Sequence, residues 1–161
     1  MDTELAQLSF ETGEFLRDRG LTLCTVESCT GGWIGELVTA TAGSSNWYDR
    51  GFITYSNDAK CELLGVDPAL LREHGAVSEE VVRAMVSGGL ERSNADLVLA
   101  VSGVAGPGGG TETRPVGMVC FAWIRRDDPV HSATLRFQGD RESVRRQAVI
   151  HALRTLKRLY E

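Results

Sequence analysis

The sequence contains no long hydrophobic run and no excess of basic residues. No apolar stretch reaches the roughly 18 residues that a membrane-spanning helix needs, and the polar, acidic start of the chain shows no secretory signal pattern. Lysine and arginine together number 17 against 22 aspartates and glutamates, which gives a formal net charge of −5. Because nucleic acids and anionic membranes bind basic surfaces, this balance argues against both as main partners. A local basic pocket for one small anion remains compatible with it.

Metal-binding patterns of cysteine and histidine are also missing. The four cysteines show no CxxC spacing and have no histidine partner nearby in the sequence: Cys24, Cys29, Cys61 and Cys120. We therefore expect no zinc site and no other metal. We also expect a cytoplasmic protein whose thiols stay reduced.

What the chain does contain is an alternation of strand and helix patterns over 161 residues, of which 42% are hydrophobic and 24% are charged. A chain of this length and composition fits one domain that buries roughly 70% of its unfolded surface. Helical patterns cover 2–20, 30–40, 57–66, 79–93 and the segment after Asp140, and strand patterns cover 21–26, 50–56, 96–104, 116–126 and 131–138. Strands separated by helices predict a single layered α/β domain over residues 1–161.

The stretch TVESCTGGWIG, residues 25–35, is the first candidate for chemistry. Ser28 follows a predicted buried strand and precedes a predicted helix, and open α/β sheets bind ligands at such strand ends. Gly31 and Gly32 let a substrate approach the backbone closely. Unpaired N–H groups in the first helical turn could receive developing negative charge. The alternative is that Ser28 or Thr30 only caps the helix.

A nucleophilic serine needs a base, and a lysine is the best candidate. The three histidines belong to no motif, which argues against a Ser-His-Asp triad: His74, His131 and His151. Lys60 lies about one turn into a short predicted helix that Ser56 or Asn57 would cap. The positive helix end and partial burial would disfavour its ammonium form, and neutral lysine can act as a base. Tyr55, at the end of the preceding strand, could orient or pass a proton. The alternative for Lys60 is an ordinary solvated lysine.

The third candidate segment is SGVAGPGGGTETRPVG, residues 102–117. It follows a predicted strand and is dense in glycine, so its backbone could wrap a phosphate or a ribose. It lacks the Gly-Lys-Ser/Thr ending of a P-loop, and a flexible turn is equally compatible with it. Arg141, Arg145 and Arg146 open the last predicted helix. They could bind a phosphate bidentately or form a solvated helix face.

Five segments together resemble the CinA C-terminal domain family, in the family's order and over nearly the whole chain. They are ESCTGG (27–32), AGSSNWYDRGFITYSNDAKCELLGV (42–66), HGAVSEEVVRAM (74–85), SGVAGPGGGTETRPVG (102–117) and GDRESVRRQA (139–148). The chain is similar to the stand-alone form of this family, in which no larger portion precedes the domain. The resemblance implies a layered α/β/α sandwich with a mixed central sheet, assembled as a homodimer.

The resemblance also implies nicotinamide-nucleotide amidase activity without a metal or a cofactor. In this reaction nicotinamide mononucleotide and water give nicotinate mononucleotide and ammonia. The family's nucleophilic serine corresponds to Ser28, its lysine to Lys60 and the tyrosine of the same motif to Tyr55. The hydroxyl residue before GxAGP corresponds to Ser102, which we expect to assist the pair. Val26 replaces the alanine of the family's usual AESCTGG, a small change within the strand that we expect to be harmless.

For the remainder of the site we expect two backbone elements and one arginine. The turn N–H groups of Thr30, Gly31 and Gly32 are expected to hold the developing oxyanion. The 5′-phosphate is expected to bind the glycine-rich loop and either Arg141 or Arg145. The loop glycines are Gly106, Gly108, Gly109 and Gly110.

Three alternatives stay open. Cys29 is a rival nucleophile, since thiolates attack amides well, although no imidazole is apparent to form an ion pair with it. Trp47 or Tyr48 could lie against the pyridine ring, or could make packing or oligomer contacts. The chain could also be a non-catalytic module that binds or senses a pyridine nucleotide, which an assay for ammonia would distinguish from an enzyme.

Overall fold

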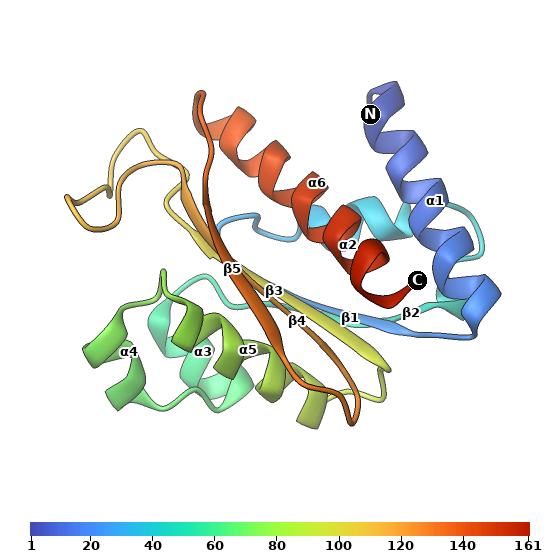
Figure 1. Ribbon diagram of the computed structural model, residues 1–161, viewed down its shortest axis with the longest axis horizontal. Coiled ribbons are helices and arrows are strands. Elements are labelled where there is room, and N and C mark those ends of the chain that lie inside the picture. The colour runs from blue at the N-terminus through green and yellow to red at the C-terminus, as the bar shows by residue number, and fades with distance from the viewer.

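The computed structural model describes all 161 residues, and it contains one five-stranded sheet between two layers of helices (Figure 1). The strand order is β2-β1-β3-β4-β5. β1 (Leu23–Glu27) lies parallel to both β2 (Tyr48–Ile53) and β3 (Leu97–Gly103). β4 (Met118–Arg125) and β5 (His131–Arg136) add two antiparallel pairs. The predicted α/β/α sandwich with a mixed sheet is therefore confirmed.

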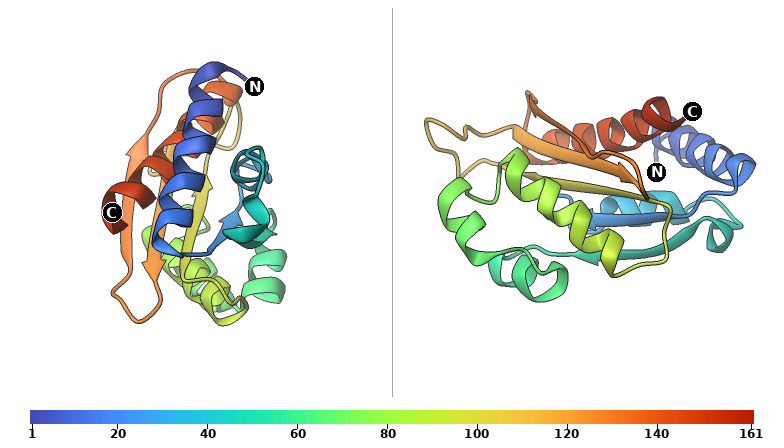
Figure 2. Two further views of the ribbon diagram at one scale, coloured as in Figure 1. Left: turned by 90° about the vertical axis from the view of Figure 1, so that its right-hand side faces the viewer. Right: turned by 60° about the horizontal axis from the view of Figure 1, so that its bottom comes forward.

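The helices divide between the two faces of the sheet, as Figures 1 and 2 show. One face is covered by α1 (Thr3–Arg19), α2 (Trp33–Thr39) and α6 (Arg141–Tyr160). The other face is covered by α3 (Asn57–Leu64), α4 (Pro68–His74) and α5 (Glu79–Glu91). A short 3₁₀ helix, Ser44–Asn46, precedes β2. None of these helices is both long and apolar enough to span a bilayer.

A hydrophobic core lies on each face of the sheet, and the central strand β3 contributes side chains to both. Leu97, Leu99 and Val101 are buried against α1, α2 and α6, whereas Val98 and Ala100 are buried against the opposite helical layer. Successive side chains of a strand point to opposite faces, so a strand covered on both sides is apolar throughout. This strand is therefore held rigidly up to Gly103, the point where the glycine-rich loop begins.

Capping residues explain where several helices begin and end. The side chains of Ser78 and Asp140 accept hydrogen bonds from the backbone N–H groups of Val81 and Ser143 at the starts of α5 and α6. Helices α1 and α3 end at Gly20 and Gly65, both in the left-handed conformation that favours glycine.

Two features differ from the sequence-based expectation. Helix α4 was not predicted, although Asp67 caps it and Pro68 opens it, which is a usual start signal. The strand predicted over 50–56 runs over Tyr48–Ile53 instead. It ends there because its partner β1 ends at Glu27, whose carbonyl accepts the Thr54 N–H at 2.8 Å. The chain beyond Thr54 is then free to turn toward α3.

Candidate active site

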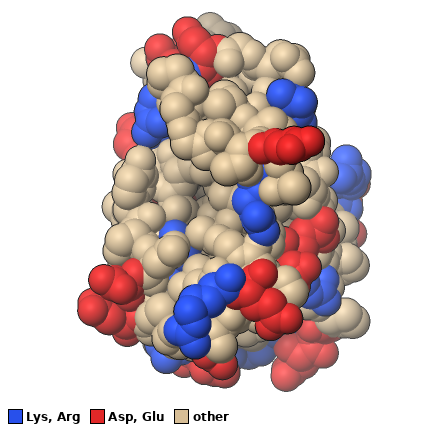
Figure 3. All heavy atoms as spheres, turned by 90° about the vertical axis from the view of Figure 1, so that its left-hand side faces the viewer, with Lys and Arg blue, Asp and Glu red and all other residues tan.

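A cavity of about 320 Å³ lies where β1 and β3 end. Figure 3 looks onto this end of the molecule, where mostly uncharged residues surround a hollow and basic side chains stand near it. The cavity is lined by most of the site residues predicted from the sequence: Ser28, Tyr55, Lys60, Ser102, Gly106, Gly108, Gly109 and Arg141. The other predicted site residues do not line it: Thr30, Gly31, Gly32, Gly110 and Arg145. No three histidine, cysteine, aspartate or glutamate side chains form a group that could hold a metal ion.

Ser28 is held in place by hydrogen bonds of its own backbone N–H and carbonyl groups. Its N–H donates to the carbonyl of Val101 at 3.0 Å, which extends the pairing of β1 with β3 by one residue. Its own carbonyl accepts the N–H of Gly31 at 3.0 Å, which closes a tight turn. The side chain is 8% exposed and opens into the cavity. The serine is therefore held at the floor of the cavity.

Lys60 is nearly inaccessible, with only 1% of its surface exposed. It lies in the first turn of α3, where Ser56 caps the helix as predicted. Its Nζ lies 3.1 Å from Ser28 Oγ, 2.8 Å from the carbonyl oxygen of Thr54 and 3.3 Å from that of Tyr55. Burial removes water from the ammonium group and thereby lowers the pKa of Lys60 from its ordinary 10.5. The alternative of a solvated lysine is wrong.

The contacts of Lys60 Nζ are compatible with a neutral amine as well as with an ammonium, whose third N–H would donate to Ser28 Oγ. A neutral amine has two N–H groups and one lone pair. The carbonyls of Thr54 and Tyr55 can accept the two N–H groups. The lone pair is then left to face the hydroxyl of Ser28. This arrangement can withdraw a proton from Ser28 without help from an imidazole or a carboxylate.

Glu27 is a site residue that sequence reasoning missed. Its carboxylate is buried, with 2% of the residue exposed. It accepts the Thr30 hydroxyl at 2.6 Å, the Ile34 N–H at 2.8 Å and the Gly35 N–H at 3.0 Å. The N-cap residue of α2 is Gly32, which has no side chain that could accept these N–H groups. Glu27 therefore caps α2 from the preceding strand, and the signal in the sequence is a glutamate at the end of a buried, mostly apolar strand.

Of the three backbone N–H groups predicted to hold the oxyanion, the structure rules out one. The Gly31 N–H is already bonded to the Ser28 carbonyl, so it is not free to receive an oxyanion. The amides of Thr30 and Gly32 make no hydrogen bond within the chain. Gly31 and Gly32 both have positive φ, at 60° and 104°, which only glycine adopts readily. The glycines thus shape the turn.

The two candidate phosphate arginines have different surroundings. Arg141 lines the cavity, and donates from Nη1 to the Gly106 carbonyl at 2.8 Å and from Nη2 to the Tyr55 hydroxyl at 3.2 Å. Arg145 instead donates to the carbonyls of Cys29 and Thr30, at 3.0 and 3.1 Å. The geometry therefore favours Arg141 at the cavity and gives Arg145 a role in bracing the nucleophile turn. Arg146, the third arginine of the segment, pairs with acidic residues at the start of the chain.

The remaining hydroxyl residues stand at the margin and on the wall of the cavity. The Tyr55 side chain is 61% exposed, so its hydroxyl stands at the rim while its carbonyl faces Lys60. Ser102, at the end of β3, is buried, and its hydroxyl makes no hydrogen bond within the chain. Ser102 is thus available to a substrate or to a water molecule.

Two aromatic residues lie outside the site. Trp47 is buried in the core beneath α1 and α2, and the hydroxyl of Tyr48 lies 2.6 Å from that of Thr25. Neither lines the cavity, so the idea that one of them stacks on a pyridine ring is wrong, and packing explains both. None of the three histidines lines the cavity either: His74, His131 and His151.

Cys29 lines the cavity beside Ser28, but its surroundings do not activate it. Burial raises the pKa of its thiol to about 12, so the thiolate form is scarce at neutral pH. Lys60 Nζ is bonded to the serine and not to this sulfur. The geometry therefore favours Ser28 over Cys29 as the nucleophile.

Comparison with known proteins gives a consistent result. The family model described as CinA C-terminal domain matches residues 5–160. Nicotinamide-nucleotide amidohydrolase PncC of Escherichia coli (strain K12) is 50% identical over 155 residues, which are 96% of this chain and 94% of that protein. PncC of Pseudomonas putida is 48% identical over 155 residues, which are 96% of this chain and 96% of that protein. The crystal structure of competence/damage inducible protein CihA from Agrobacterium tumefaciens matches with a TM-score of 0.96 and 40% identity, over 100% of this chain and 98% of that chain.

Proposed function

Because the chain belongs to the CinA C-terminal domain family, we propose that it hydrolyses the carboxamide of nicotinamide mononucleotide to nicotinate mononucleotide and ammonia. The observation that carries this proposal is the buried 3.1 Å contact between Lys60 Nζ and Ser28 Oγ at the floor of the cavity. A cavity of about 320 Å³ is of the size that small-molecule sites have. The PncC relatives support the choice of substrate.

In the first half of the reaction, neutral Lys60 takes the proton of Ser28 Oγ as this oxygen attacks the carboxamide carbon. The negative charge that develops on the carbonyl oxygen needs fixed donors, and the unpaired amides of Thr30 and Gly32 are the candidates. An amine leaves poorly unless it is protonated. The lysinium returns the proton to the leaving nitrogen, ammonia departs, and an ester on Ser28 remains.

In the second half, water hydrolyses the ester. Lys60 is neutral again and takes a proton from the water that attacks the ester carbonyl. The proton then passes to Ser28 Oγ as the carbon–oxygen bond breaks, which releases nicotinate mononucleotide and restores the serine. Ser102, on the cavity wall, is placed to assist through its unbonded hydroxyl. Every step uses side chains and backbone groups of this chain.

The phosphate end of the substrate is assigned to the rim of the cavity. Arg141 supplies positive charge there, and Gly106, Gly108 and Gly109 expose the backbone beside it. Glycine lets an anion approach the N–H groups closely. The pyridine carboxamide then points toward Ser28, as the chemistry requires.

The nucleophile assignment is tested by measuring ammonia release from nicotinamide mononucleotide. We expect Ser28→Ala to abolish release and Cys29→Ala to retain it, since the Cys29 thiol has a raised pKa and no base. Nicotinamide riboside and glutamine serve as control substrates. The opposite pattern of activity in the two variants would assign the nucleophile to Cys29.

The same assay tests the activity itself. Binding of nicotinamide mononucleotide without ammonia release by the unsubstituted chain would identify the non-catalytic sensing module instead. The buried contact between Ser28 and Lys60 favours the enzyme, because a purely binding site has no need of an unpaired buried lysine.

A further inference from the structure

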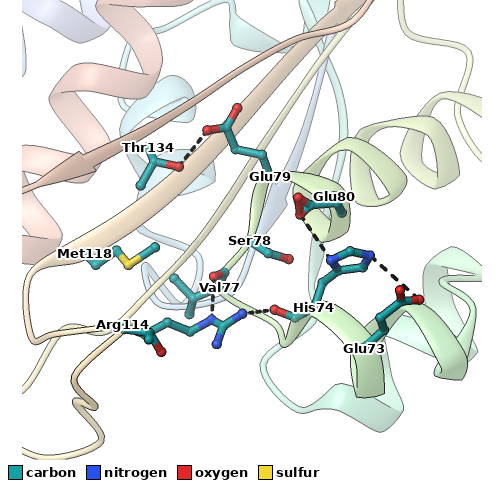
Figure 4. Close-up of a pocket in the computed structure, with 10 residues that line it drawn as sticks. Glu73, His74, Val77, Ser78, Glu79, Glu80, Arg114, Met118 and Thr134 are labelled. Atoms are coloured by element: carbon teal, nitrogen blue, oxygen red, sulfur yellow. Dashed lines mark hydrogen bonds and ion pairs between the residues drawn. The ribbon is translucent and has the colours of Figure 1, made fainter.

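One side chain joins the two loops that form opposite walls of the cavity. Arg114, in the returning limb of the glycine-rich loop, donates from Nε to the Val77 carbonyl at 2.9 Å and from Nη2 to the His74 carbonyl. Figure 4 shows the guanidinium reaching from its own loop to both acceptors, of which His74 ends α4 and Val77 lies between α4 and α5. The two loops are about forty residues apart in the sequence.

Both joined loops contribute to the walls of the cavity. Ala76 and Val77 line it from one side, and Gly106 and Gly108 line it from the other. Val77 also borders a second, larger hollow of about 570 Å³ on its far side, where Arg114 lies. Val77 therefore packs against the core with only part of its surface, and the hollow leaves the rest uncovered. Arg114 supplies support in that place.

The glycine-rich loop depends on such ties because its own sequence leaves it free. Glycine restricts the backbone least of all residues, and four of the five residues 106–110 are glycine. Backbone hydrogen bonds between Val104 and both Gly117 and Met118 close the neck of the loop. Arg141 binds the first part of the loop by donating to the Gly106 carbonyl. Arg114, in the last part of the loop, ties it to the Val77 carbonyl.

The surroundings of Arg114 are shaped to receive its side chain. Its backbone is fixed in a turn, because Thr111 N–H donates to the Arg114 carbonyl at 2.8 Å and the Thr111 hydroxyl accepts the Arg114 N–H at 3.0 Å. Gly75 faces the guanidinium, and a Cβ at this position would lie 3.1 Å from Arg114 Cζ. The absence of a side chain at Gly75 thus leaves room for the tie.

We propose that Arg114 is a positioning residue of this site: by tying the glycine-rich loop to the Val77 segment it holds the substrate-binding walls in place before substrate arrives. The proposal rests on the proposed function for its kinetic part. Ser28 follows β1 and Lys60 lies in α3, and Arg114 makes no hydrogen bond to either element. Loss of the tie should therefore weaken substrate binding while the chemical step is retained.

The test compares Arg114→Met, which removes all donors, with Arg114→Lys, which keeps a charged donor. We expect the KM for nicotinamide mononucleotide to rise about tenfold in Arg114→Met, with kcat changed by less than about threefold. The KM of Arg114→Lys should lie between that of Arg114→Met and that of the unsubstituted chain. Arg125→Met is the matched control, because Arg125 is exposed at the opposite end of the sheet. A fall in kcat at constant KM would overturn the proposal.

A second measurement does not depend on the reaction. Hydrogen exchange followed by mass spectrometry should show faster exchange over 105–116 and 75–78 in Arg114→Met than in Arg125→Met, with partial recovery in Arg114→Lys. Unchanged exchange in both segments would overturn the proposal even if the enzyme is active. Absence of ammonia release from the unsubstituted chain would instead refute the proposed function, and the exchange result would still decide whether the tie exists.

Discussion

Lys60 illustrates how single residues set the chemistry of this cavity. A buried ammonium is unfavourable unless it is paired with a charge. Its nitrogen has the carbonyls of Thr54 and Tyr55 and the hydroxyl of Ser28 as hydrogen-bond partners, and no carboxylate among them. Carbonyl partners orient the amine without holding the proton as strongly as a carboxylate would. These surroundings therefore allow Lys60 to be neutral.

We predict that turnover rises with pH through the lowered pKa of Lys60. Only the neutral amine can accept the serine proton, so the active fraction increases as the pH increases. Because burial moves this pKa below 10.5, the rise should be complete at a lower pH than an exposed lysine would give. The measurement is kcat/KM against pH.

The control for this prediction is Lys60→Arg, which keeps the positive charge but stays protonated at every accessible pH. It should be inactive over the whole profile. Substantial activity in this variant, at any pH, would mean that the base is another group.

At the scale of elements, the turn between β1 and α2 depends on the carboxylate of Glu27. This group satisfies three donors that the glycine-rich turn leaves without a cap. Arg145 braces the same turn from α6 by binding the carbonyls of Cys29 and Thr30. The position of Ser28 therefore depends on side chains from two other elements as well as on its own backbone.

We predict that Glu27→Gln lowers the free energy of unfolding by about 1–3 kcal/mol, because an amide nitrogen replaces one accepting oxygen and leaves a buried donor unsatisfied. Turnover should fall as well, since the turn carries the nucleophile. Denaturant unfolding and ammonia release measure the two effects. Glu36→Gln, on the exposed side of the same helix, should change neither. Equal effects in both variants would contradict the role given to Glu27.

Much of this arrangement could be predicted from sequence where a local rule applies. Ser78 and Asp140 mark helix starts, and Gly20 and Gly65 mark helix ends, because capping depends on neighbouring residues. The family motifs indicated Ser28 and Lys60, which the fold brings to 3.1 Å.

Other features depend on contacts between distant segments, which a local pattern does not contain. Arg145 finds its two carbonyl acceptors 115 and 116 residues away. Trp47 and Tyr48 resembled candidates for ring stacking only because their burial could not be known. The homodimer stays a prediction.

At the scale of the whole molecule, close packing of α5 sets where Lys60 lies. Gly88 and Gly89 are adjacent in α5. A Cβ at Gly88 would overlap the carbonyl oxygen of Leu64 at the end of α3, and one at Gly89 would lie 2.8 Å from a methyl of Val26 in β1. The glycine pair therefore lets α5 approach both the helix that carries the base and the strand that leads to the nucleophile.

We predict that Gly88→Ala lowers the free energy of unfolding by about 1–3 kcal/mol, because a backbone oxygen cannot move away as a side chain can. Helix propensity alone predicts the opposite, a gain of about 1 kcal/mol. Turnover should also decrease as α3 is displaced. Ser87→Ala, at the exposed neighbouring position, is the control and should be neutral or stabilising. A more stable Gly88→Ala variant would show that α3 and α5 are less closely packed than described.

Helix α6 has a consequence for the use of this protein as a reagent. It begins with Arg141 beside the cavity and continues to Tyr160, about 30 Å away at 1.5 Å per residue. Figure 1 shows the C-terminus on the side of the molecule away from the glycine-rich loop. If the chain were immobilised on a solid support through a tag after Glu161, the end of the molecule that contains the cavity would therefore face the flowing solution.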